Sequence, residues 1–320
     1  MLRPRLKGKV LFVFSDPGGA KPCLSLIAED GISDVLVISD RSYSFYGDFG
    51  VPVSFPDATP LDIINDFKPE VIFTGTSYTS DLELCFISLA KQLGIPCISF
   101  VDHWTSIAKR FLMKDGEFCF PDFIWVIDQR AKEIAIKDGI DSSLVIISGN
   151  PYHQWLSKWL PKVEKNQYLE KISSDIEFKK IVVFAPDPLS NINGKSTYGF
   201  DELTATSKFM ELLEQRKEEI EDWAILIKMH PNQQIEGLKK ITENYSFVFL
   251  VESTIDVNET IFFADIVVGF FSSFLIEAQI MGKPVVRFIG PDTITDPFEE
   301  LNVGIKAGGD TLITEILKYV

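Results

Sequence analysis

The sequence has few cysteines and little positive charge, and both shortages exclude classes of protein. Its 320 residues include four cysteines, none in a CxxC pair, so neither a disulfide framework nor a metal site is expected. All four lie in the N-terminal half among apolar neighbours, which predicts buried free thiols. The net charge is −15, from 31 basic and 46 acidic residues. This balance argues against a nucleic-acid partner, because a duplex binder needs a basic surface to neutralise phosphates.

Long hydrophobic runs are also missing. No stretch approaches the roughly 20 apolar residues of a membrane-spanning helix, and the apolar run at 10–14 is too short for a signal-peptide core. We therefore expect a soluble, cytoplasmic protein. Residues 1–9 carry four basic side chains, which predicts a solvated N-terminus. The alternative is peripheral contact of this arm with acidic lipid at the inner face of the membrane.

What the sequence does contain is an alternation of short apolar runs and helical patterns. The runs are apolar throughout, as expected for strands of a parallel sheet that are covered on both faces. We predict strands at 9–14, 34–39, 71–74, 97–101, 123–127, 144–147, 180–185, 223–228, 247–251, 266–269 and 284–288. We predict helices at 22–28, 81–93, 130–138, 200–220 and 273–281.

This order of elements predicts two domains. The alternation pauses in a polar, Trp-bearing stretch and then restarts, and the chain is longer than one compact domain usually is. The predicted fold is therefore α/β, with two Rossmann-like, doubly wound parallel-sheet domains facing a cleft. The boundaries are 1–155 for the N-terminal domain, 156–176 for the connector and 177–320 for the C-terminal domain.

Candidate site residues follow the strands of the first half, because ligands bind outside the carboxyl ends of parallel strands. Asp16 begins a predicted turn in which Gly18 and Gly19 let backbone amides approach a ligand; a plain tight turn is the alternative. Asp102 and His103 follow the strand at 97–101 and form a plausible acid/base pair. The alternative is a capping aspartate beside a packed histidine.

In the second half, the segment Lys228-Met229-His230-Pro231 follows a predicted strand. Lys228 and His230 suit a phosphate leaving group, whose developing charge needs donors, and Pro231 keeps His230 out of a helix. A lone histidine is usually structural. However, the chain has only three, and His230 shares with the other two, His103 and His153, a predicted place in a loop after a strand. This favours a functional role for His230.

The segment 264–278 predicts a strand, a turn with Ser272 and Ser273, and a helix. Either serine can cap the helix while its first amides bind phosphate. Glu277 either hydrogen-bonds a ribose or completes a capping box. Glu252 and Ser253, after the strand at 247–251, are candidates for contact with a nucleobase; a loop carboxylate is the alternative.

The order of "KMHP", "AD-IVVG-x-x-SS-x-x-x-EA" and "GKPVV" resembles the donor-binding domain of GT-B glycosyltransferases and of UDP-N-acetylglucosamine 2-epimerases. The His-Pro pair followed by Ser-Ser is most similar to bacterial GT-B sialyltransferases and Kdo transferases of surface-polysaccharide biosynthesis, which use CMP-linked sugars. The resemblance implies that His230 assists the departing phosphate and that Ser272 and Ser273 hold it. Asp102 is the first candidate for the general base and Asp16 the second, because the family's acidic-acidic-glycine motif has only partial matches.

We therefore predict an inverting, metal-independent glycosyltransferase with a CMP-sugar donor, or UDP as the alternative, and no cofactor beyond this substrate. The expected acceptor is a glycan or glycolipid, as in capsule or lipopolysaccharide synthesis. The predicted C-terminal domain binds the nucleotide sugar and the N-terminal one the acceptor. The chain lacks a DxD motif at a strand end, in agreement with metal independence. Two alternatives remain: a UDP-sugar 2-epimerase, and a non-catalytic sugar-nucleotide-binding protein.

Overall fold

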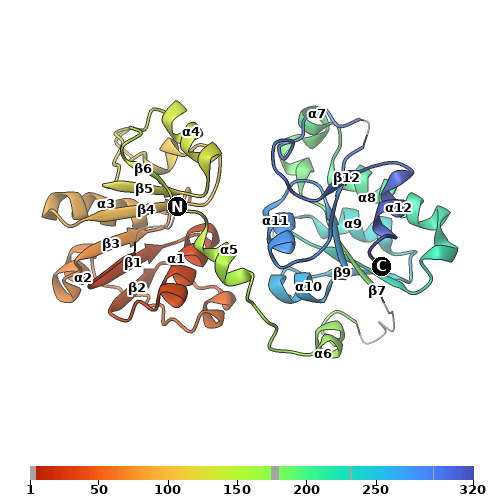
Figure 1. Cartoon of the computed structure of the whole chain (residues 1–320), viewed down its shortest axis with the longest axis horizontal. Coiled ribbons are helices and arrows are strands. Elements are labelled where there is room, and N and C mark those ends of the chain that lie inside the picture. Colours follow the sequence, from red (N-terminus) through yellow and green to blue (C-terminus); the bar gives the residue numbers. More distant parts are fainter. Residues whose placement is uncertain (1–4, 174–179, 231–232, 291) are drawn as a thin grey trace. The chain divides into compact units, whose positions relative to one another are not determined.

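The computed structural model describes residues 5–173, 180–230, 233–290 and 292–320. The chain divides into two compact units, Met1–Trp155 and Leu156–Val320. Each unit contains one six-stranded sheet in which all neighbouring strands are parallel (Figure 1). The predicted α/β architecture with two doubly wound parallel sheets is confirmed.

The N-terminal unit has the strand order β2-β1-β3-β4-β5-β6. Because β1 lies between β2 and β3, the connections reverse between β1 and β3. In parallel α/β sheets, ligands bind at the carboxyl ends of the strands beside such a switch point. The strands are β1 Val10–Phe14, β2 Val35–Ser39, β3 Val71–Thr74, β4 Cys97–Val101, β5 Phe123–Val126 and β6 Val145–Ile147. The helices are α1 Pro17–Asp30, α2 Pro60–Phe67, α3 Leu82–Leu93, α4 Gln129–Lys137 and α5 Pro151–Leu156, with 3₁₀ turns η1 Ser44–Asp48 and η2 Ala108–Phe111.

The C-terminal unit also has a parallel six-stranded sheet, but its order is β12-β11-β10-β7-β8-β9. Here two strands, β8 and β9, lie on one side of β7 before the connections reverse between β7 and β10. Its strands are β7 Lys180–Ala185, β8 Trp223–Lys228, β9 Val248–Val251, β10 Ile266–Gly269, β11 Val285–Phe288 and β12 Ile305–Ala307. Its helices are α6 Lys165–Glu170, α7 Gly194–Tyr198, α8 Glu202–Gln215, α9 Ile235–Thr242, α10 Val257–Phe263, α11 Ser273–Ile280 and α12 Thr311–Ile316, with 3₁₀ turns η3 Leu189–Ile192 and η4 Lys217–Glu219.

The two faces of the C-terminal sheet pack into separate cores. Successive strand residues point to opposite faces, so Val182 and Phe184 join one core while Ile181 and Val183 join the other. The first core contains Phe209 of α8, whose ring centroid lies 4.7 Å from that of Phe184. Both faces are thereby covered, and polar side chains gather at the ends of the strands.

The start of α1 differs from the prediction. The helix begins at Pro17, so Gly18 and Gly19 form its first turn instead of a tight turn before it. Proline is compatible with the first helical position, because its missing N–H has no intrahelical partner there. A Cβ atom on Gly19 would lie 3.0 Å from the Cα of Gly75, so the helix start packs against the backbone after β3. The glycines allow this close approach.

Three further expectations need correction. Cys85 is exposed on α3, whereas Cys23 and Cys97 are buried, so burial of all four thiols was a wrong prediction. His153 lies within α5 instead of a loop, which removes part of the argument for His230 that rested on the shared loop setting. The helix predicted at 200–220 ends at Gln215, where a 3₁₀ turn takes over.

Candidate functional site

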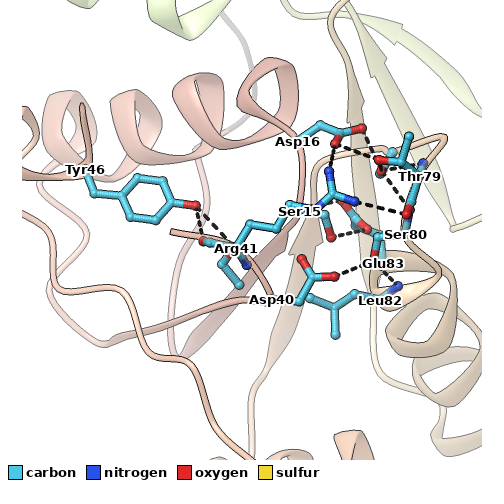
Figure 2. A network of polar contacts seen from close by, with 11 residues as sticks. Ser15, Asp16, Asp40, Arg41, Tyr46, Thr79, Ser80, Leu82 and Glu83 are labelled. Carbon is cyan, nitrogen blue, oxygen red and sulfur yellow. Dashed lines mark hydrogen bonds and ion pairs between the residues drawn. The ribbon is translucent and has the colours of Figure 1, made fainter. Parts of the chain in front are cut away.

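Asp16 follows β1 at the carboxyl edge of the N-terminal sheet. It occupies the N-cap position of α1, but its side chain makes no capping hydrogen bond. Instead its carboxylate accepts hydrogen bonds from Arg41 Nη1 at 2.5 Å, Ser77 Oγ at 2.6 Å and Thr79 Oγ1 at 3.1 Å (Figure 2). Asp16 is therefore held by three donors from the segments that follow β2 and β3.

Asp102 follows β4 and lies against the start of α1. A Cβ atom on Gly18 would lie 2.0 Å from its Oδ2, so the carboxylate fills the space that a side chain at Gly18 would need. Arg110 of η2 donates from Nη1 to Asp102 Oδ1 at 3.2 Å and to Thr76 Oγ1 at 3.1 Å. Its guanidinium also lies 4.6 Å from the ring centroid of Tyr78, a cation–π contact. The structure thus brings Asp102 and Gly18 together.

His103 is exposed, and its Nδ1 lies 3.0 Å from the hydroxyl of Thr105. Burial of part of the ring lowers its pKa, and the charge of Arg110 lowers it further against the opposing effect of Asp102. No hydrogen bond between His103 and Asp102 is seen in the described residues. The predicted pair of Asp102 and His103 is therefore not joined by a hydrogen bond in this part of the chain.

Glu83, which the sequence did not single out, lies behind this edge in the first turn of α3. Its side chain is buried and accepts hydrogen bonds from the backbone N–H of Ser15 at 2.8 Å and from its hydroxyl at 3.0 Å (Figure 2). Burial raises the pKa of Glu83 to about 7, and the charge of Asp16 adds to the rise. Glu83 thus anchors Ser15, the residue that follows β1 and precedes Asp16.

In the C-terminal unit, Lys228 ends β8 and His230 follows it. Lys228 is buried, and its Nζ donates to the carbonyl of Met229 at 2.6 Å. His230 is exposed; its backbone N–H donates to Gln233, whose amide donates to the carbonyl of Pro186 after β7. Partial desolvation and then the charge of Lys228 lower the pKa of His230, which favours a neutral imidazole. Pro231 lies outside the described residues.

Ser272 and Ser273 open α11 after β10. Ser272 is the N-cap residue but makes no side-chain capping bond, and its Oγ lies beside the carboxyl group of Asp187, which follows β7. Ser272 Oγ and Asp187 Oδ2 are both buried, and neither makes a hydrogen bond of regular geometry within the described chain. Burial raises the pKa of Asp187 to about 7, opposed by the N–H of Phe271 and the hydroxyl of Ser272.

The remaining candidates lie further along the same edge. Glu252 and Ser253 are exposed after β9, and Thr254 donates to the Glu252 carboxylate at 3.4 Å. Glu277 is half-buried in α11. Because α11 starts after Ser272, the third helical position belongs to Leu275, and a capping box with Glu277 is not formed. The strand order β10-β7-β8-β9 places the segments that carry these residues side by side.

Both switch points of the fold carry a carboxylate. In the N-terminal unit, Asp16 follows β1 where the connections reverse; in the C-terminal unit, Asp187 occupies the same position after β7. Arg41 and Asp187 also follow strands, β2 and β7, so the same rule would have identified both as candidate site residues. Nothing in the sequence pattern indicated Arg110 or Glu83, since the first lies in a short 3₁₀ turn and the second in an apolar helix face.

A family model described as CDP-Glycerol:Poly(glycerophosphate) glycerophosphotransferase matches residues 141–293, a range that includes His230 and Ser272. No curated protein matches the chain. The chain is similar to the UDP-GlcNAc 2-epimerase of Methanocaldococcus jannaschii, with a TM-score of 0.66 and 13% identity over 97% of this chain and 92% of that one.

Two other solved structures also have a fold similar to that of this chain. The putative UDP-N-acetylglucosamine 2-epimerase of Listeria monocytogenes has a TM-score of 0.67 at 16% identity, covering 97% of this chain and 87% of that one. Anabaena HepE, solved in complex with UDP-glucose, has a TM-score of 0.59 at 14% identity, covering 96% and 88%. The chain has a GT-B-like fold. At such low identity the likeness shows the fold alone, and the family match adds a loose indication of a transferase.

The more specific resemblance to sialyltransferases and Kdo transferases is not shown by these comparisons. Within the described residues of this GT-B-like chain, no group of three His, Cys, Asp or Glu side chains is arranged to hold a metal ion. None of the described helices is both long and apolar enough to cross a bilayer.

Proposed function

We propose that this chain is a transferase that binds a nucleotide-linked donor at the carboxyl edge of its C-terminal sheet. The observation that carries the proposal is the start of α11, where Ser272 leaves its capping role unused beside the β7–β10 switch point. The first amides of a helix have no intrahelical partners and attract anions. Together with the Ser272 and Ser273 hydroxyls, they form a site suited to a phosphate.

His230 is the proposed donor to the leaving phosphate. Its lowered pKa favours the neutral imidazole, which still carries one N–H to donate. Lys228 supplies positive charge from a buried position one strand away from the switch point. We assign contacts with the nucleoside to Glu252, Ser253 and Glu277. This arrangement stabilises the negative charge that develops when the bond to the nucleotide breaks.

Asp102 is the proposed general base. Asp16 already accepts three hydrogen bonds, one of them from Arg41, so most of its about four lone-pair sites are occupied. Asp102 has one arginine partner at 3.2 Å and is positioned by Gly18. In the proposed step Asp102 takes the proton of an acceptor hydroxyl, the hydroxyl oxygen attacks the transferred group, and the nucleotide phosphate leaves with the bonding electrons.

A cytidine donor is favoured by two similarities that involve the same part of the chain. The family model is named for CDP-glycerol, and the His-Pro and Ser-Ser motifs resemble enzymes that use CMP-sugars. Transfer of a sugar from a CMP-sugar and transfer of glycerol phosphate from CDP-glycerol both release CMP. We propose sugar transfer, inverting and independent of metal, onto a surface polysaccharide or glycolipid; glycerol phosphate is the alternative group.

A UDP-sugar 2-epimerase is the second candidate, supported by structural likeness to two such proteins over 97% of the chain. It differs from a transferase in needing no acceptor. A binding protein that shares the fold is the third candidate.

Thermal shift with CMP, CDP, UDP and GDP tests the donor, because a ligand that binds only the folded state raises stability by mass action. We expect the largest stabilisation from a cytidine nucleotide. Turnover of CMP-sugars and CDP-glycerol is then measured in EDTA, with and without acceptor. Release of CMP that needs an acceptor supports the proposal. Conversion of a UDP-sugar without acceptor supports the epimerase, binding without turnover supports a binding protein, and no stabilisation by any nucleotide overturns all three.

A further inference from the structure

Asp187 has an unusual position for a carboxylate. It lies at the C-terminal switch point, directly behind the hydroxyl of Ser272, where a phosphate is proposed to bind. Its Oδ2 is fully buried and makes no hydrogen bond of regular geometry in the described chain. A buried ionised carboxylate beside a bound phosphate would be strongly unfavourable, because both groups are negative and water is excluded.

The charged groups around Asp187 do not offset its charge. Glu202 of α8 is a second carboxylate, held by the N–H of Ser190 at 2.8 Å and by its hydroxyl at 2.5 Å, and its charge raises the pKa of Asp187. On the neighbouring strand, Lys228 directs its ammonium to the Met229 carbonyl. The pKa of His230 is lowered, which favours the uncharged ring. The surroundings of Asp187 therefore favour its neutral form.

The protonation of Asp187 decides which way the Ser272 hydroxyl points. A serine hydroxyl carries a single hydrogen and can accept while it donates. When Asp187 is ionised, Ser272 donates to it and offers only lone pairs to a phosphate. When Asp187 carries a proton, it donates to Ser272 Oγ, and Ser272 is able to donate to the phosphate. One proton on Asp187 thus converts Ser272 from a repelling group into a binding one.

We propose that Asp187 is a positioning residue that holds a proton whenever a nucleotide phosphate occupies the start of α11, so that Ser272 donates to that phosphate. The inference rests on the proposed function, since it concerns the same nucleotide site. It adds that binding of the nucleotide takes up a proton. The proposal rests on the position of Asp187 after β7 and on the buried oxygens of Asp187 and Ser272, which make no hydrogen bond of regular geometry in the described chain.

The way in which nucleotide affinity depends on pH follows from the pKa of Asp187. The pKa of Asp187 is already raised to about 7 in the free chain, and a bound phosphate raises it further. Below pH 6 the residue is protonated before binding, so Asp187 adds no pH dependence to the affinity. Above pH 7 each binding event must add a proton, and affinity falls by about tenfold per pH unit until the pKa of the complex is reached.

Calorimetry with CMP from pH 7 to 9 tests this inference, because the phosphate of CMP is already largely dianionic above its pKa of about 6. Repeating each titration in buffers of different ionisation enthalpy gives the number of protons taken up. We expect the Kd of the unmodified chain to rise about tenfold per pH unit, with uptake approaching one proton. D187N, whose amide donates to Ser272 as the protonated acid would, is expected to bind with no pH dependence.

E83Q is the matched control, because Glu83 also has a pKa of about 7 but lies in the N-terminal unit. It should keep the pH dependence of the unmodified chain. CMP binding by the unmodified chain without proton uptake, or a D187N variant that keeps the full pH dependence, overturns the role of Asp187 and leaves the proposed function standing. A chain that binds no nucleotide at any pH overturns both. The uptake measurement needs no variant, so a misfolded D187N would not prevent a decision.

Discussion

At the carboxyl edge of the N-terminal sheet, Asp16 and Asp102 are each paired with an arginine, Arg41 and Arg110. At the corresponding edge of the C-terminal sheet, the switch point carries Asp187 without a basic partner among the groups that set its pKa. In both sheets the switch point lies beside the first strand of the unit, although the two strand orders differ, so this position alone does not produce the difference. It comes from the residues that follow each strand.

The difference indicates that the polar side chains at the two strand edges are arranged differently. In the N-terminal unit hydrogen bonds fix the carboxylates of Asp16 and Asp102, which would hold the proposed base in one orientation. In the C-terminal unit a buried hydroxyl and a buried acid lack regular partners. Because buried polar groups are nearly always hydrogen-bonded, this adjacent pair agrees with the proposal that a phosphate supplies a further partner. The following experiments test whether the contrast holds, in order of expected effect.

D102N is expected to reduce transfer by about 10²- to 10⁴-fold, because the amide cannot accept the proton of the acceptor hydroxyl. Donor binding should persist, since the proposed donor contacts lie in the other unit. Turnover is measured as CMP release and binding by calorimetry. D16N provides the contrast: a larger loss of turnover from D16N than from D102N would transfer the role of base to Asp16.

R287A is expected to lower the free energy of unfolding by about 3 kcal/mol, because it removes the buried guanidinium that donates to Asp296 and to two backbone carbonyls. Lys306 still pairs with Asp296 in this variant. Arg287 is 1% exposed and donates to Asp296 and to the carbonyls of Phe270 and Phe298. R41A, which breaks a pair that is about one-third exposed, should cost under about 1 kcal/mol. Urea denaturation of both variants measures the loss in the free energy of unfolding. Equal losses would contradict the expectation that the buried ion pair contributes more than the exposed one.

H230A is expected to lower turnover by about 10²- to 10³-fold while leaving the melting temperature unchanged, since the ring is exposed. H103A is the matched control, because His103 is also exposed and its ring contacts the Thr105 hydroxyl. It should keep turnover within a few-fold of the unmodified chain. Full activity of H230A would remove His230 from the mechanism.

E83Q is expected to change how stability depends on pH. The pKa of Glu83 is about 7 in the folded chain and lower when unfolded, so the folded form binds the proton more tightly. Its contribution therefore falls as the pH rises from about 4.5 to about 7 and stays low above that. The free energy of unfolding of E83Q relative to the unmodified chain should rise by roughly 2–3 kcal/mol between pH 4 and pH 8. A constant difference would place the pKa of Glu83 near its ordinary value.

Most of the strands could be predicted from the sequence, because continuous apolar runs leave few alternatives. The strand at Lys180–Ala185, for example, was predicted with the bounds that the structure shows. The strand Ile305–Ala307 was missed because it is three residues long and mostly exposed. Helix α1 was predicted to start late because the Pro-Gly-Gly sequence, typical of turns, here serves close packing against Gly75.

The candidate site was predictable only in part. Residues directly after strands, such as Asp102 and His230, are found by their order along the chain. Their partners are not, because Arg110 reaches Asp102 from a 3₁₀ turn whose position depends on packing. The pKa of Asp187 is likewise set by burial among segments far apart in sequence. The functional roles of Asp102, His230, Ser272 and the other candidates remain predictions.

Gly18 carries no functional group, yet the orientation of Asp102 depends on it. Since a Cβ atom there would overlap the Asp102 carboxylate, one added methyl group would displace the carboxylate without changing any charge or hydrogen-bonding group. If Asp102 is the proposed base, random mutagenesis scored by activity would report position 18 as essential even without a contact between Gly18 and the substrate. Substitutions at position 18 would fail because a side chain there does not fit beside the Asp102 carboxylate. Only a second substitution that made space for this side chain could restore activity.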